Sequence, residues 1–123
     1  MVGSARTILF AIFSLLVFVP AVPVAYAGEL TWHFRSEHQY AVSLEFYSDD
    51  HVWPGNDEVY VIRDYEQHDY SLACRSGEKI CYGAWVRNNT SSYWGSGYNG
   101  AEACDSCCFR CDGGDTPVIV LNR

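Results

Sequence analysis

The chain has 123 residues, of which 15 are Asp or Glu and 8 are Lys or Arg, so its formal net charge is −7 with neutral histidines. Binding to nucleic acid or to an anionic membrane surface requires clustered Lys and Arg, so this balance predicts neither kind of partner. After the N-terminal segment described next, the length fits one domain.

A secretory signal peptide is predicted over residues 1–27. A short positive segment precedes an apolar run over residues 7–19, and Ala25 and Ala27 form an A-x-A cleavage signature. The first proline ends the apolar run well short of the roughly 20 residues that a membrane-spanning helix needs. We therefore expect a single secreted or periplasmic domain, residues 28–123, with no membrane association after cleavage.

Alternating apolar residues predict strands in the N-terminal half of this domain. Leu30, Trp32 and Phe34 alternate with polar residues, and residues 42–46 repeat the pattern. Further strands are predicted at residues 58–65, 70–74 and 117–121, whereas residues 88–100 are interpreted as a long loop or a twisted edge. No window has helical spacing. The sequence therefore predicts an all-β fold, a small antiparallel sandwich or half-open barrel stapled by disulfides.

Six cysteines predict the disulfide framework. An even number of cysteines behind a signal peptide, in fewer than 100 residues, is typical of small disulfide-stapled domains. The six are Cys74, Cys81, Cys104, Cys107, Cys108 and Cys111. The last four form two abutting C-x-x-C units, and we expect them to pair among themselves, across each unit or in a crossed arrangement.

A hairpin is predicted between the strands that carry the first two cysteines. If residues 76–79 form a four-residue loop, Cys74 lies opposite Cys81 at a separation that a disulfide can close. The same register gives two further matched pairs, Leu72 with Gly83 and Tyr70 with Trp85. We therefore predict a Cys74–Cys81 bridge.

Two alternatives are kept for the C-terminal cysteines. Paired C-x-x-C spacing also occurs in structural zinc sites, so the alternative metal ligands are Cys104, Cys107, Cys108 and Cys111. The adjacency of Cys107 and Cys108 disfavours this, because two neighbouring side chains reach one tetrahedral ion with difficulty. The other alternative is a thiol-redox dithiol, disfavoured because a turn, and no helix, follows the motif. No cofactor is expected.

The remaining polar residues show no arrangement typical of catalysis or metal binding. The four histidines of the domain, His33, His38, His51 and His68, are interpreted as solvated residues because their spacing repeats no ligand pattern. The acidic group of Asp64, Glu66 and Asp69 lacks the ordered spacing of a calcium loop and is interpreted as a solvated face. No nucleophile motif is found, so no catalytic residue is predicted.

An aromatic cluster is the strongest functional signal in the sequence. Trp85, Tyr93, Trp94 and Tyr98 fall within 14 residues rich in Ser, Asn and Gly, the composition of adaptable binding loops. The alternative is that these rings belong to the core, which aromatic residues commonly dominate. We expect a non-enzymatic exported domain that binds an unknown protein or glycan partner, with this segment as its surface.

The segment from Cys74 to Trp85, the pair Trp94-Gly95 and the C-x-x-C-C-x-x-C tail together resemble small uncharacterised bacterial secreted or periplasmic proteins rich in cysteine. The resemblance covers much of the chain after the signal peptide. It implies an exported product and carries no activity.

Overall fold

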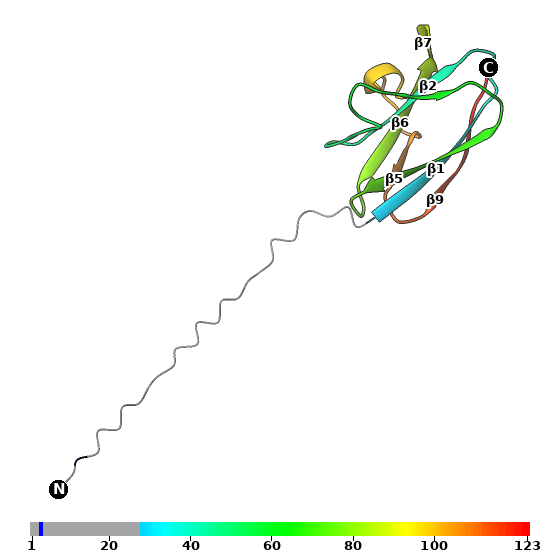
Figure 1. Ribbon diagram of the computed structural model, residues 1–123. Helices are drawn as coiled ribbons and strands as arrows, with labels where there is room; N and C mark the ends of the chain where they lie inside the picture. Colours follow the sequence, from blue (N-terminus) through cyan, green and yellow to red (C-terminus); the bar gives the residue numbers. More distant parts are fainter. Residues whose placement is uncertain (1–2, 4–27) are drawn as a thin grey trace.

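The computed structural model describes residue 3 and residues 28–123, so the predicted signal peptide, apart from residue 3, lies outside the described residues (Figure 1). In residues 28–123 the chain forms nine strands and one short 3-10 turn. They are β1 (Gly28–Ser36), β2 (Val42–Tyr47), β3 (Val52–Trp53), β4 (Tyr60–Ile62), β5 (Gln67–Cys74), β6 (Lys79–Val86), β7 (Asn89–Gly95), η1 (Tyr98–Gly100), β8 (Cys108–Arg110) and β9 (Asp115–Leu121). Across the described residues, no helix has the length and apolar character to cross a membrane.

The strands form two open sheets that share one core. Sheet A has the order β5-β1-β9, in which β1 pairs antiparallel with β5 and parallel with β9. Sheet B has the order β3-β2-β6-β7, with β4 also paired to β2 and β8 also paired to β6, all antiparallel. The predicted all-β, disulfide-stapled sandwich is therefore confirmed, and sheet A adds a parallel pair that the sequence did not indicate.

The core forms where the predicted alternation places it. Leu30, Trp32 and Phe34 of β1 are buried against Leu44 and Phe46 of β2, so each sheet contributes its inward-facing residues. The ring centroids of Trp32 and Phe46 lie 4.9 Å apart across the two sheets. Burying a large apolar side chain contributes about 1.5–3 kcal/mol to stability, so these contacts hold the two sheets together.

The predicted hairpin between residues 70 and 85 is wrong. β5 belongs to sheet A and β6 to sheet B, so the turn between them carries the chain from one sheet to the other. Glu78 shapes this turn: its backbone N–H donates to the Arg75 carbonyl at 2.9 Å, and its carboxylate accepts the Arg75 N–H at 2.9 Å. The residues expected to face each other across the hairpin pair elsewhere, Leu72 with Leu30 and Trp85 with Ser43.

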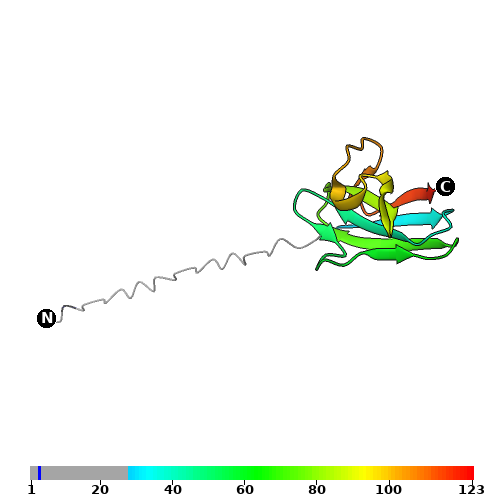
Figure 2. The ribbon, with the colours of Figure 1, turned by 90° about the horizontal axis from the view of Figure 1, so that it is seen from above.

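Residues 88–100 combine both predicted possibilities. β7 is an edge strand on β6, and the chain then bends through η1 back over the outer face of sheet B. Gly83 of β6 permits this close approach, because a Cβ atom there would clash with the Gly97 carbonyl. Figure 2 shows this yellow and orange segment lying along the outside of the strands. The predicted strand at 58–65 is shorter than expected, since only Tyr60–Ile62 pairs with β2.

Candidate functional site

All six cysteines form disulfides, which confirms the predicted framework but corrects its pairing. The bonds are Cys74–Cys111, Cys81–Cys108 and Cys104–Cys107. The predicted Cys74–Cys81 bridge is wrong because Cys74 faces the core from sheet A, while Cys81 lies on β6 directly opposite Cys108 of β8.

The expectation that the last four cysteines pair among themselves holds only for Cys104–Cys107. β8 pairs with β6, which brings Cys108 opposite Cys81. The chain after β8 is held by a hydrogen bond from the Cys111 N–H to the Glu78 carbonyl at 2.9 Å, and this places Cys111 beside the end of β5.

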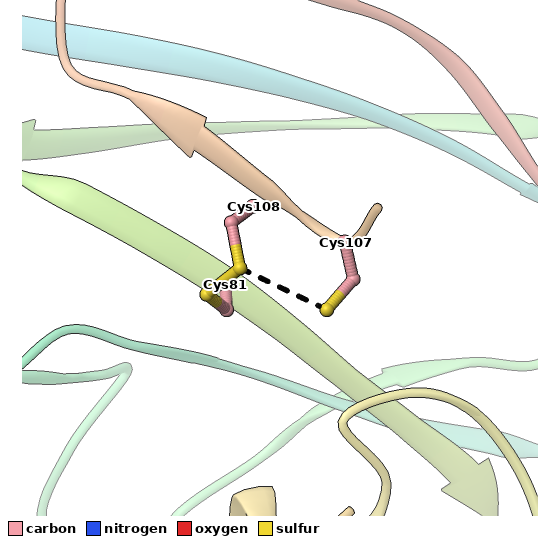
Figure 3. Close-up of side chains that lie close together, drawn as sticks. All are labelled: Cys81, Cys107 and Cys108. Atoms are coloured by element: carbon pink, nitrogen blue, oxygen red, sulfur yellow. Dashed lines mark hydrogen bonds between the residues drawn. A yellow bond between two sulfur atoms is a disulfide. The ribbon is translucent and has the colours of Figure 1, made fainter. Parts of the chain in front are cut away.

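Three sulfur atoms nevertheless gather where β6 meets β8. The Sγ atoms of Cys81, Cys107 and Cys108 all lie within 4.8 Å of one another, and those of Cys107 and Cys108 are 3.9 Å apart (Figure 3). Zinc is ligated by thiolates, and each of these sulfurs is held in a disulfide. Cys111 of the alternative zinc set is bonded to Cys74 and is no part of this group. Because all three sulfurs are held in disulfides, the oxidised cluster offers no thiolate ligand and does not fit zinc.

The four aromatic residues of the predicted binding segment do not form one exposed surface. Trp85 is only 4% exposed, and its ring centroid lies 5.2 Å from that of Tyr98 in an edge-on arrangement. Tyr93 and Tyr98 are exposed. Trp94 packs against the core, and its indole N–H donates to Oδ1 of Asn122 at 3.3 Å. A partner could reach Tyr93 and Tyr98, but not the whole set from one side.

Four arginines lie at one end of the sandwich. We name this end of the molecule the arginine end. β1 and β9 run parallel, and the loop after β1 leads to the start of β2, where β4 and β6 both end. Four strands therefore finish at the same end, and each has an arginine within two residues of its last residue: Arg35, Arg63, Arg87 and Arg123. In the sequence, each of these strands has a basic residue near its end. This pattern indicates a site only once the strand directions are known, because the directions bring the four ends together.

Two adjoining hollows open at the arginine end and share His38 as a common wall. The first has a volume of about 840 Å³ and is lined by Arg35, Arg123, Tyr65 and Glu37 among others. The second, of about 520 Å³, is lined by Arg63, Arg87, Tyr40, Asn88 and Asn89 among others. Arg35 contacts Glu37 at 3.6 Å, and in residues 28–123 the other three arginines form no ion pair. The lining thus carries four guanidinium groups and one acidic side chain.

A second polar cluster, on the outer face of sheet A, was missed by the sequence analysis. Nδ1 of His33 lies 2.5 Å from Oδ1 of Asp69, and Nε2 lies 2.9 Å from Oδ1 of Asp115. The hydrogen bond with Asp69, followed by that with Asp115, raises the pKa of His33, and the same bond from His33 lowers the pKa of Asp69. His33 is on the central strand, so it links both neighbouring strands. None of the hollows described above borders it, so its evident role is to clamp the sheet.

Among known proteins, no family, curated protein or solved structure matches this chain.

Proposed function

We propose that this chain is an exported, non-enzymatic domain that binds an acidic glycan at the arginine end. The observation that carries the proposal is the lining of the two adjoining hollows, which contains four arginines and a single acidic side chain, that of Glu37. This concentration of positive charge occurs in a chain whose formal net charge is −7.

The chemistry of arginine favours an anionic ligand. The planar guanidinium group donates paired hydrogen bonds that match a carboxylate, sulfate or phosphate group. Since Arg63 and Arg87 lie on either side of the β2 start and line the same hollow, their side chains are close enough to serve one ligand. The surrounding negative charge of the domain repels unbound polyanions, so binding depends on contact with these arginines and not on long-range attraction.

The aromatic and amide groups favour a glycan over an acidic peptide. Tyr40 and Tyr65 border the two hollows and are each 62% exposed, which makes their rings accessible to a ligand. The negative face of an aromatic ring attracts polarised C–H groups such as those of a pyranose ring. Asn88 and Asn89 offer amide donors and acceptors suited to hydroxyl groups. The two hollows adjoin at His38, which sets them side by side for an extended chain of sugars.

Export is part of the same proposal. The predicted cleavage after Ala27 and the three disulfides both fit a secreted or periplasmic location, because disulfides persist in oxidising compartments. N-terminal sequencing of the protein from its native source should begin at Gly28, and retention of the apolar run would contradict export by signal cleavage.

Isothermal titration tests the binding site with defined probes. The acidic glycan probes are oligogalacturonate, which carries carboxylates, and heparin oligosaccharide, which carries sulfates. Dextran oligosaccharide is the neutral glycan probe, and poly-glutamate is the acidic peptide probe. The double variant Arg63→Gln/Arg87→Gln should weaken binding of an acidic oligosaccharide by about tenfold or more, because hydrogen bonds to charged groups contribute about 1.5–3 kcal/mol each.

The matched control removes the same charge from the opposite end of the sandwich. Lys79 and Arg110 pair with each other in register on β6 and β8, so Lys79→Gln/Arg110→Gln should leave affinity nearly unchanged. The proposal is overturned if neither acidic oligosaccharide binds, if the two double variants behave alike, or if poly-glutamate binds more tightly than both glycans.

A further inference from the structure

The sulfur cluster between β6 and β8 contains two disulfides close enough to exchange partners. Cys107 Sγ is 3.9 Å from Cys108 Sγ and within 4.8 Å of Cys81 Sγ, so the Cys104–Cys107 bond lies beside the Cys81–Cys108 bond. Figure 3 shows the Cys107 sulfur directed toward the Cys81–Cys108 bond. The Cys74–Cys111 bond lies outside this cluster.

The sulfurs of Cys107 and Cys108 also lie at similar distances from the backbone carbonyl of Cys104. The sulfur of Cys107 lies 3.6 Å from the Cys104 carbonyl oxygen, and that of Cys108 lies 3.9 Å from the same atom. On the other side, the backbone of Cys107 accepts a hydrogen bond from the Tyr82 N–H at 3.1 Å, next to Cys81. Both sulfurs of the adjacent pair therefore lie beside the Cys104 backbone and within 4.8 Å of Cys81 Sγ.

We infer that Cys104 is a site of attack by a small external thiol, which interchanges the two neighbouring disulfides. Cys104 is half-buried in the loop before β8, whereas Cys107 is only 2% exposed. An external thiolate therefore reaches the Cys104 sulfur, and Cys107 becomes the leaving thiolate inside the cluster. The rate of thiol–disulfide exchange depends on how easily the nucleophile reaches the disulfide and on which sulfur it attacks.

The exchange balances without any oxidant or reductant. The external thiolate bonds to Cys104 Sγ and releases the Cys107 thiolate. That thiolate attacks Cys81 Sγ, which forms Cys81–Cys107 and releases the Cys108 thiolate. The Cys108 thiolate then attacks Cys104 Sγ, which forms Cys104–Cys108 and returns the external thiol. Three bonds form and three break, so the thiol acts in catalytic amounts and the product is a disulfide isomer of the same chain.

The charges around Cys104 select the class of thiol. Glu102 lies two residues before it and Asp105 directly follows it, and both are exposed. These carboxylates repel an anionic thiol such as glutathione and favour a cationic aminothiol such as cysteamine. Surface charge interactions of this size correspond to roughly threefold to tenfold in rate at physiological salt.

Disulfide mapping after incubation with a substoichiometric amount of cysteamine tests the interchange. Tryptic cleavage at Arg87 and Arg110 leaves one peptide that contains Cys104, Cys107 and Cys108, joined to the peptide of Cys81. In the starting pairing, fragmentation of the peptide bond between residues 107 and 108 separates the two disulfides. In the isomer, the Cys104–Cys108 disulfide joins the two sides of that cleaved peptide bond, so the fragments stay linked. We expect the isomer to appear faster with cysteamine than with glutathione, and Glu102→Gln/Asp105→Asn to abolish the difference.

A second variant isolates the internal step. Cys104→Ser leaves Cys107 as a free thiol beside Cys81–Cys108, so alkylation should label both Cys107 and Cys108. The Cys74–Cys111 bond is the internal control and should stay unlabelled, which separates local exchange from unfolding. Label confined to Cys107 in this variant, or starting pairing alone after cysteamine treatment of the unaltered chain, would refute the inference.

Discussion

The cross-link between Cys74 and Cys111 should contribute more to stability than any other disulfide of the domain. It joins residues 37 positions apart, further than the 27 of Cys81–Cys108 and the 3 of Cys104–Cys107. On the chain-entropy account, a loop of this length stabilises the fold by about 3.9 kcal/mol, whereas the four-residue loop of Cys104–Cys107 contributes about 1.9 kcal/mol. We therefore expect Cys74→Ala/Cys111→Ala to lower the free energy of unfolding by about 4 kcal/mol.

Urea denaturation followed by tryptophan fluorescence measures this difference, because the Trp32 ring is fully buried between the sheets. Cys104→Ala/Cys107→Ala is the matched comparison, since it also replaces two bonded cysteines by alanine. Cys74 and Cys111 are both buried, whereas only Cys107 is buried in the other pair, so lost packing adds slightly to the difference between the variants. Equal destabilisation by the two double variants, or a larger effect of the Cys104–Cys107 pair, would refute the assignment of the long cross-link.

Two further predictions concern residues that the sequence analysis interpreted differently. Trp85→Ala should lower the free energy of unfolding in urea by about 3–5 kcal/mol, because the Trp85 ring is buried. Tyr93→Ala, on the facing strand, should lower it far less, and equal effects of the two variants would contradict the burial of Trp85. For His33, the raised pKa adds stability that is present below its unfolded value of about 6.5 and is lost as the pH rises through the folded value. The lowered pKa of Asp69 adds stability that is present above about pH 4 and is lost on further acidification. The clamp should therefore be strongest between about pH 4 and 6.5. His33→Gln should lower stability in this window and reduce the loss of stability on either side of it; a profile of unchanged shape would contradict the clamp.

The strands and their inward faces could be predicted because alternation is a local property. Leu30, Trp32 and Phe34 are apolar at every second position, and a half-buried strand is the structure that uses this period. The same information says nothing about which strands pair. The turn at Arg75 and Glu78 has the length and composition of a hairpin, yet it changes sheet, because the partners of β5 and β6 lie far away in the sequence.

The candidate sites depend on those distant pairings, which is why they were found only in part. Trp85 and Trp94 are close in sequence, and that proximity suggested that they share one surface. They lie on neighbouring strands with opposite orientations, so their side chains are on different faces of the sheet. In contrast, Arg35 and Arg87 are far apart in sequence and lie at the same end of the sandwich only because their strands end together. His33 likewise gains its role from Asp69 and Asp115, which reach it through register and not through spacing.

The central position of β1 governs the order in which the chain is able to fold. Its partners β5 and β9 come from the middle and the far end of the chain, as the pairs Leu30 with Leu72 and Ser36 with Leu121 show. Each pairing requires closure of a long loop before any contact energy is gained, which slows folding to the millisecond-to-second range typical of such β topologies. Until β9 has joined, the β1 edge that it covers is open to pairing with other chains. Sheet A is thus complete only once β9 lies beside β1, the first strand of the domain.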